Sequence, residues 1–162
     1  AYLPVQDFGN AFSTFIAQNF GAHQKERLRS GIRIATCVSA LFSLMLSLLV
    51  FIFAKPLMLL FVKADEVKII ASGVQYLRIE GVFYIGIGCL FLLYGLYRSI
   101  DKPQMSLVLT IISLGLRVVL AYALAPIFGE VGIWIAIPIG WFLADLFGYL
   151  YYLLHRRQLL SF

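Results

Sequence analysis

The sequence is short of charge. Only 13% of its 162 residues are charged, whereas 62% are hydrophobic and the mean hydropathy is +0.92. A water-soluble fold of this length has too little interior to bury so many apolar side chains. The composition therefore excludes a soluble globular domain and predicts that the chain folds in a lipid bilayer.

Motifs typical of enzymes are also lacking. The two cysteines and two histidines are not spaced as zinc ligands would be, and there is no P-loop or dinucleotide fingerprint. Cys37 and Cys89 both fall in apolar segments, where small buried side chains are a better interpretation than a disulfide. No nucleophile and base stand in a recognisable pattern. We therefore expect no enzyme activity, no catalytic residues, no metal site and no cofactor.

Long apolar segments are what the sequence has instead. A helix that crosses a bilayer needs about 20 mostly apolar residues. Five segments have about this length: residues 3–22, 34–54, 74–98, 104–126 and 131–153. The strict alternation that marks a transmembrane β-barrel is absent. The sequence predicts an all-α, polytopic transmembrane helix bundle of about five spans, with residues 1–162 forming a single transmembrane domain.

The beginning of the chain predicts a larger parent protein. The sequence opens with Ala1 and enters a helical pattern almost at once, without the basic region and cleavage site of a signal peptide. Five spans without any soluble domain are typical of a part of a longer membrane protein. We therefore expect the chain to be a fragment.

The basic residues are distributed unevenly between the two ends of the expected bundle. Eight of the thirteen lie in or beside the loops 23–33 and 99–103 and at the C-terminus: Lys25, Arg27, Arg29, Arg33, Arg98, Lys102, Arg156 and Arg157. The positive-inside rule places these loops and the C-terminus in the cytoplasm of a cell membrane. A topology signal with lipid contact explains the basic loops better than nucleic-acid binding, so no nucleic-acid partner is expected.

Polar residues recur on one face of each of the first two segments. The first face carries Asp7, Asn10, Thr14 and Gln18. Such a face avoids lipid, so it lines a water-filled cavity or bonds to other helices, and both interpretations stay open. The second face carries Thr36, Ser39, Ser43 and Ser47. Small hydroxyl residues allow close helix approach, so we predict packing there.

The third segment combines a glycine stripe with a carboxylate among aromatic rings. Gly81, Gly88 and Gly95 recur every seven residues and predict close helix packing. The neighbouring face carries Tyr76, Glu80, Tyr84, Ile87, Phe91 and Tyr94. Ring faces and a carboxylate both attract an organic cation. A proton carrier or a structural ion pair would fit Glu80 equally well.

Two further charges lie deep in the last two segments. Counting ~1.5 Å per helical residue, Arg117 lies roughly 13 Å below Pro126, and Glu80 lies roughly 10 Å below Gly73. These depths favour a pair between Arg117 and Glu80. A pair between Arg117 and Asp145 stays open, because the two segments that carry them are joined by a short loop. Pro138 predicts a kink in the last segment.

Three stretches resemble one transporter family. Ala-Gln-Asn-Phe-Gly-Ala at 17–22, followed by a basic loop, resembles the eighth helix of the multidrug and toxic compound extrusion (MATE) family. The stretch Tyr-Leu-Arg-Ile at 76–79 is similar to the opening of that family's tenth helix, and residues 132–141 are similar to its last helix. The resemblance covers essentially the whole chain, which would then be helices eight to twelve of twelve.

The resemblance implies a function. Members of the family exchange cationic drugs or metabolites for protons or sodium ions by alternating access between two lobes. Glu80 matches an acidic position that takes part in cation coupling in several members. Arg117 and Asp145 match no family motif, so their roles as charge partners rest on the physical argument alone. The expected partners are an organic cation, membrane lipid and the missing N-terminal lobe of the same chain.

The resulting hypothesis is a secondary antiporter. Glu80, helped by Asp7, would bind the coupling proton or sodium ion. Asn10, Thr14, Tyr84 and Phe91 would line the substrate cavity, and a sodium ion would take oxygen ligands from the first segment if the helices meet. Two alternatives stay open: a lipid-linked oligosaccharide flippase of the same superfamily, which would need several cavity cations, and a non-transporting scaffold with closed ion pairs.

Overall fold

The computed structural model describes residues 3–159, apart from the side chains of residues 157 and 158, so Ala1 and the side chain of Arg157 lie outside the described part. Six helices follow one another: α1 (Leu3–Gly21), α2 (Lys25–Leu59), α3 (Val67–Val82), α4 (Tyr84–Ser99), α5 (Pro103–Phe128) and α6 (Glu130–Leu159). The described residues form no strand. The prediction of an all-α bundle is confirmed.

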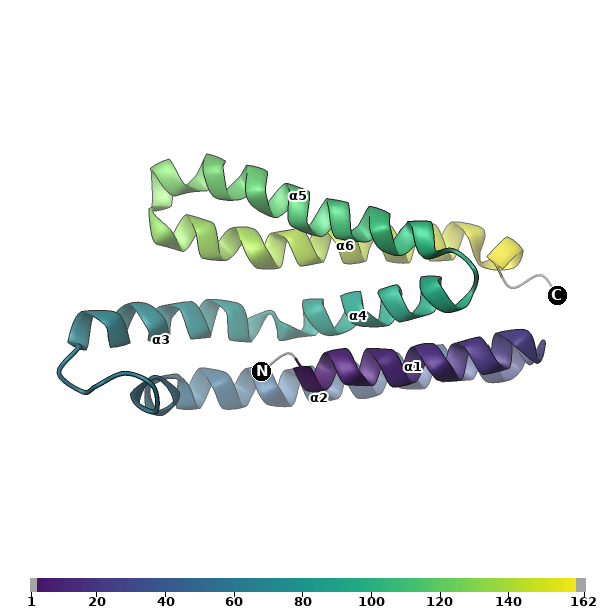
Figure 1. Ribbon diagram of the computed structural model, residues 1–162, viewed down its shortest axis with the longest axis horizontal. Helices are drawn as coiled ribbons and strands as arrows, with labels where there is room; N and C mark the ends of the chain where they lie inside the picture. The colour runs from purple at the N-terminus through teal and green to yellow at the C-terminus, as the bar shows by residue number, and fades with distance from the viewer. Residues whose placement is uncertain (1–2, 160–162) are drawn as a thin grey trace.

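The helices lie in three layers (Figure 1). One layer holds α1 and α2, the middle one holds α3 and α4 nearly end to end, and the third holds α5 and α6. Helix α4 packs against α1 and α2 on one side and against α5 and α6 on the other. It is therefore the central element, and each of its faces has a different set of neighbours.

Lipid is the natural solvent for this bundle. By length and apolarity α2, α5 and α6 are each able to cross a membrane, and α3 with α4 makes a fourth crossing if the two count as one broken span. Many large apolar side chains point outward, such as Leu41 and Leu48 on α2 and Val119 on α5. Helix α1, which carries the polar face, is not among the candidate spans of the described residues. The chain is thus multi-pass, with fewer clear crossings than the five expected.

The third predicted segment is broken. It starts earlier than expected, at Val67, and bends by 50° between α3 and α4. Phe83 at the break has φ −101° and ψ 14°. Its N–H donates to the Glu80 carbonyl at 3.2 Å, and the Gly86 N–H donates to the Phe83 carbonyl at 2.9 Å. These tight turns replace the regular helical ladder, which frees backbone groups beside Glu80.

Proline affects the helices differently from the expectation. Helix α2 passes through Pro56 and ends at Leu59, but Phe53 leaves helical geometry at φ −96° and ψ 15°. A proline lacks an N–H and crowds the preceding turn, which explains a kink three residues before it. Pro138 does not interrupt α6, which runs as one helix from Glu130 to Leu159.

Glycine and serine form the contact between α4 and the α1–α2 layer. A Cβ on Gly95 would lie 2.8 Å from the Gly9 carbonyl oxygen, and one on Gly88 would lie 2.6 Å from Ser43 Oγ. Ser39 and Ser43 are buried at this contact. A Cβ fits at neither glycine without a shift; at Gly95 the two helices meet backbone to backbone, and at Gly88 the glycine meets serine side chains. The predicted packing role of both stripes is borne out at these positions.

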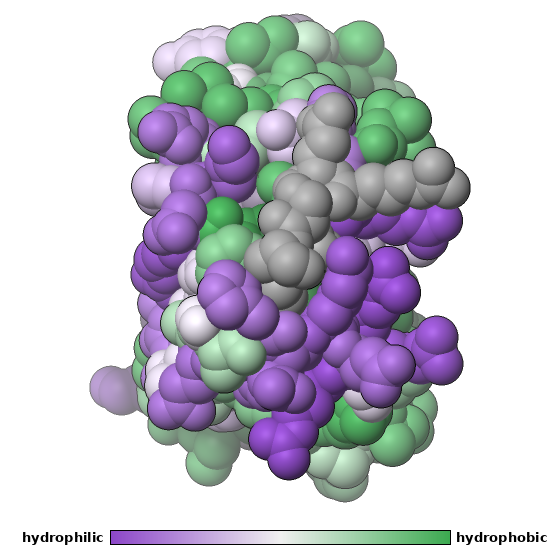
Figure 2. Space-filling model, turned by 90° about the vertical axis from the view of Figure 1, so that its right-hand side faces the viewer, coloured by the Kyte–Doolittle hydropathy of each residue, from purple (hydrophilic) through white to green (hydrophobic). Residues whose placement is uncertain are grey.

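Charged side chains gather at one end of the bundle. The α1–α2 connection, the α4–α5 connection and the last turn of α6 all lie at this end (Figure 1). Hydrophilic side chains cover much of it (Figure 2), and the sequence places Lys25, Arg98 and Lys102 there. The charge asymmetry seen in the sequence therefore corresponds to two physical ends. That the basic end faces the cytoplasm stays a prediction.

Candidate functional site

A cavity of about 450 Å³ lies between the middle layer and the α5–α6 layer. The residues that line it are Tyr76, Leu77 and Glu80 of α3, Tyr84, Ile87, Leu90, Phe91 and Tyr94 of α4, Thr110, Ser113, Leu114 and Arg117 of α5, and Ile137 and Trp141 of α6. All six residues of the carboxylate-bearing face that the sequence predicts are among them. The break at Phe83 leaves that face continuous along α3 and α4.

Glu80 is the buried acid of this cavity. Its side chain is 5% exposed, and its Oε1 is buried without a hydrogen-bond partner among the described residues. It lies in the last turn of α3, where unsatisfied carbonyls carry partial negative charge. A carboxylate with a free oxygen beside a helix C-terminus favours a bound cation or proton.

Arg117 shares the cavity with Glu80. These two are the only charged side chains among the described residues that line it. Asp145 lines a different cavity, so the structure brings Arg117 together with Glu80 and not with Asp145. One positive charge thus lines the same cavity as the carboxylate, and Glu80 Oε1 has no hydrogen-bond partner among the described residues.

The predicted residues of α1 do not join this cavity. Asn10 lines a neighbouring one of about 400 Å³ with Phe91 and Tyr94, and its Oδ1 accepts a hydrogen bond from Arg98 at 3.3 Å. Thr14 is exposed and donates to the Asn10 carbonyl at 3.3 Å. Asp7 is exposed and lines neither cavity.

The expected set of sodium ligands is therefore not assembled within the described residues. Glu80 lies in one cavity, Asn10 in the next, and Asp7 and Thr14 on the exposed face of α1. The helical spacing of the α1 residues correctly puts them on one face. It carries no information about which neighbour that face meets.

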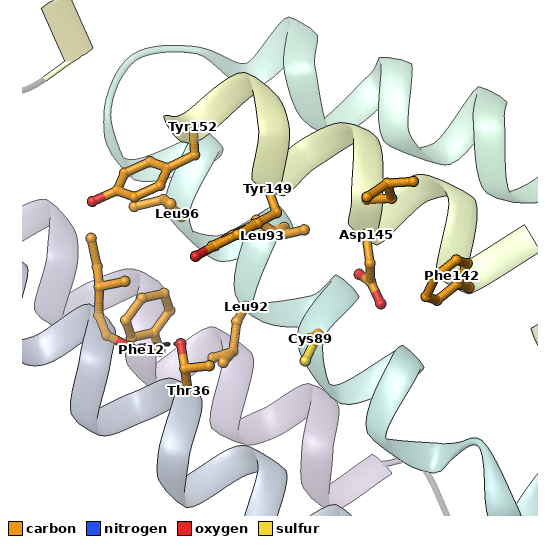
Figure 3. A pocket seen from close by; sticks show the side chains of 12 residues that line it. Phe12, Thr36, Cys89, Leu92, Leu93, Leu96, Phe142, Asp145, Tyr149 and Tyr152 are labelled. Atoms are coloured by element: carbon orange, nitrogen blue, oxygen red, sulfur yellow. Dashed lines mark hydrogen bonds between the residues drawn. The ribbon is translucent and has the colours of Figure 1, made fainter. Parts of the chain in front are cut away.

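Asp145 lies in a third cavity, of about 300 Å³, between α1, α2, α4 and α6. Figure 3 shows its carboxylate directed from α6 into this space, across from Cys89 of α4. Asp145 Oδ1 is buried and has no hydrogen-bond partner among the described residues. Glu80 is thus buried and Asp145 partly buried, and each has one buried carboxylate oxygen without a partner among the described residues, in two separate cavities.

Comparison with known proteins gives the family. The family model described as MatE matches residues 1–123. The chain belongs to the MatE family. The probable multidrug resistance protein YpnP of Bacillus subtilis (strain 168) is 29% identical over 154 residues, which are 93% of this chain and 34% of that protein.

Solved structures share the fold of this MatE chain. An inward-facing conformation of a multidrug resistance MATE family transporter of the MOP superfamily matches with a TM-score of 0.88 at 23% identity, over 98% of this chain and 37% of that one. An outward-facing conformation matches with the same TM-score and identity, over 98% and 36%. The chain therefore spans about a third of the length of these relatives. The suspected family is confirmed, and the fold is that of a multi-pass membrane transporter, not of an enzyme.

One wall of the Glu80 cavity in this MatE chain was not predicted from the sequence. Thr110 and Ser113 of α5 line it together with Arg117. These three positions are spaced i, i+3 and i+7, so they lie on one helix face. The same pattern that identified the polar faces of the first two segments would have found this one. Trp141 and Ile137 complete the wall from α6.

Proposed function

We propose that this chain is part of one lobe of a secondary antiporter that exports organic cations in exchange for protons or sodium ions. The observation that carries the proposal is Glu80, a buried carboxylate that lines a cavity of about 450 Å³ and has one oxygen without a hydrogen-bond partner among the described residues. Intramembrane acids are expensive to keep, so an unpartnered one points to a transport role.

The walls of the cavity support a cationic substrate. Tyr76, Tyr84, Phe91 and Tyr94 surround the space that Glu80 faces. Tyr76 packs edge-on against Trp134, with ring centroids 5.7 Å apart, and Phe91 packs similarly against Tyr94 at 6.2 Å. Rings held in place by such contacts offer their faces to a cation at little cost in conformational entropy.

Exchange follows from competition for one carboxylate. A proton or sodium ion on Glu80 removes the charge that attracts the organic cation, and a bound organic cation leaves no room for the ion. Arg117 has a role in this cycle. When Glu80 is neutralised, the remaining positive charge in the cavity favours release of a cationic substrate.

Alternating access needs a lobe that keeps its internal structure. The fold of the chain matches the inward-facing and the outward-facing relative with the same TM-score of 0.88. This equality supports a rigid-body movement of the lobe, in which the cavity is carried from one side of the membrane to the other.

The two alternatives have less support. A flippase for a pyrophosphate-linked lipid would need several cations, and Arg117 is the only basic residue among the described residues of the cavity. A scaffold would be expected to close its ion pairs. Glu80 Oε1 and Asp145 Oδ1 lack hydrogen-bond partners among the described residues.

The test is efflux of a fluorescent organic cation from proteoliposomes that contain the full-length parent protein. A sodium gradient and a proton gradient are imposed separately, with the wild type and with Glu80→Gln. We expect efflux driven by one of the two gradients and a loss of about a hundredfold or more in Glu80→Gln, as is common when a buried charge partner is removed.

The matched control is Glu66→Gln, which makes the same chemical change at an exposed residue preceding α3. Its efflux should equal that of the wild type. Gradient-driven efflux that persists in Glu80→Gln would remove Glu80 from the coupling. No efflux of the wild type under either gradient would contradict the antiporter itself.

A further inference from the structure

The cavity below Asp145 is independent of the Glu80 cavity. The two have no lining residue in common, and helix α4 separates them by presenting Cys89, Leu92 and Leu96 to one and Phe91 and Tyr94 to the other. The proposed exchange mechanism uses nothing in the Asp145 cavity, so this second acid needs its own explanation.

The Asp145 cavity is apolar with one charge. Leu92, Leu93 and Leu96 of α4 line it, and the ring of Phe12 of α1 lies beside Leu92 (Figure 3). No basic side chain lines it among the described residues. Among the described lining residues, Asp145 therefore carries the only charge in a cavity lined mainly by apolar side chains.

An unpartnered carboxylate oxygen in such a space lacks a positive donor. Burial of a polar group without a hydrogen bond is costly, and burial of an unpaired charge is more costly still. Apolar and aromatic walls suit the body of a ligand, and a single acid fixes where its charged end lies. A volume of about 300 Å³ is at the lower end of ligand pockets, which selects a small molecule.

We propose that Asp145 and this cavity form a second binding site, which takes a small amine with an apolar body. The ammonium group donates to the Asp145 carboxylate, and the body packs against Leu92 and Leu96 and against the rings of Tyr149 and Tyr152. The site does not depend on the proposed antiport, because it contains no residue of the Glu80 cavity.

Cys89 provides a native reporter, because its thiol lines the same cavity as Asp145. The full-length parent protein in detergent is treated with methyl methanethiosulfonate. Modification of the Cys89 peptide is followed over time by mass spectrometry, with and without 4-phenylbutylamine. Cys37 is exposed and lines none of the cavities described above, so its peptide is the internal reference.

We expect 4-phenylbutylamine to slow modification of Cys89, and the concentration that halves the rate should be at least about tenfold lower than for a neutral analogue, the effect of a charge-assisted hydrogen bond; Cys37 should be unchanged. The neutral analogue 4-phenylbutan-1-ol should protect Cys89 much less. Asp145→Asn should bring protection by the amine down to that by the alcohol. Glu80→Gln should keep full protection, whatever it does to efflux.

Three results would overturn the proposal. Equal protection by the amine and the alcohol in the wild type would mean that the cavity binds the apolar body without recognising the ammonium charge. This comparison uses the wild type alone, so it does not depend on the folding of a variant. Undiminished protection in a folded Asp145→Asn would place the amine elsewhere. A Cys89 that resists modification without any amine, while Cys37 reacts, would mean that another segment of the parent protein fills the cavity.

Discussion

Helix α4 has two faces of opposite character. Toward α1 and α2 it presents Gly88 and Gly95, which meet Ser43 and the Gly9 backbone with no room for a methyl group. Toward α5 and α6 it presents Tyr84, Phe91 and Tyr94, which border a cavity of about 450 Å³. At Gly88 and Gly95 the helix is in close contact with its neighbours, whereas its aromatic face borders open space.

The comparison of the glycine face with the aromatic face shows how helices in lipid can pack closely on one side of α4 and leave a cavity on the other. Helices in lipid gain little from hydrophobic burial against each other, so close packing at small residues must hold them. The glycine side supplies that contact. Because the glycine side holds the helices together, the aromatic side can leave an unfilled cavity around Glu80 and Arg117.

The largest expected effect is at the glycine face. In Gly95→Leu the new Cβ would lie 2.8 Å from the Gly9 carbonyl oxygen, which belongs to the backbone and cannot rotate away. We expect a loss of about 3 kcal/mol or more in the free energy of unfolding. Folded yield and thermal unfolding in detergent measure it.

Gly115→Leu is the control for that substitution. Gly115 lies inside α5, and a Cβ added there would meet nothing within 4 Å, so leucine should be tolerated or slightly stabilising. Equal behaviour of the two variants would mean that α1 and α4 do not approach as closely as described.

The next effect concerns the two charges of the cavity at the aromatic face. Arg117→Gln should lower gradient-driven efflux at least about tenfold. The double variant Glu80→Gln with Arg117→Gln should have the same efflux rate as Glu80→Gln alone, because the effects of two coupled residues are not additive. Asp145→Asn serves as the comparison. Because Asp145 lines another cavity, Asp145→Asn should leave efflux unchanged, alone and in combination with Arg117→Gln, and a change that depends on Arg117 would transfer the pairing to Asp145.

A moderate effect is expected from the aromatic wall. Tyr84→Leu should raise the half-saturation concentration for an organic cation about 2- to 30-fold, which corresponds to the loss of one cation–π contact. The free energy of unfolding should fall by no more than about 1.5 kcal/mol. Tyr122→Leu, at an α5 position that is 80% exposed, should leave transport unchanged; a similar change there would assign the effect to lipid contact.

The smallest effect is expected at the serines of the glycine face. Ser43 is fully buried and its Oγ has no hydrogen-bond partner among the described residues, so Ser43→Ala should be neutral or stabilising by up to about 1 kcal/mol. Ser99→Ala should instead destabilise by about 1 kcal/mol, because Ser99 Oγ donates to the carbonyls of Ser13 at 2.8 Å and Gly95 at 2.7 Å. The measurement is the thermal midpoint of each variant relative to the wild type, which should stay or rise for Ser43→Ala and fall for Ser99→Ala.

Helical periodicity accounts for what the sequence predicted well. The positions from Tyr76 to Tyr94 recur at helical spacing, so their common face could be recognised before any tertiary contact was known. The same holds for the stripe that contains Gly88 and Gly95, because glycine at a seven-residue repeat has few uses in a membrane helix except close approach.

Contacts between distant segments could not be predicted in this way. The polar face of α1 was recognised, yet spacing within one helix does not reveal that Asn10 meets Arg98 while Asp7 stays on the exposed side. The break at Phe83 carries no proline signal, and the residues around it are ordinary for a membrane helix. Helices α3 and α4 both pack against α2 and α6, but only α4 also packs against α1 and α5, so the two halves have different tertiary surroundings that no local pattern reveals.

The bend at Phe83 also has a mechanical meaning. A straight helix transmits a force along its axis to its far end, whereas a bent helix converts part of that force into a component perpendicular to the axis. Helices α3 and α4 meet at 50°, and α4 is the element on which every layer bears. A load applied along α3 at the loop before Val67 would therefore meet α4 at an angle of 50° to its own direction. Glu80 lies about one turn before the bend at Phe83, where a force along α3 would change direction.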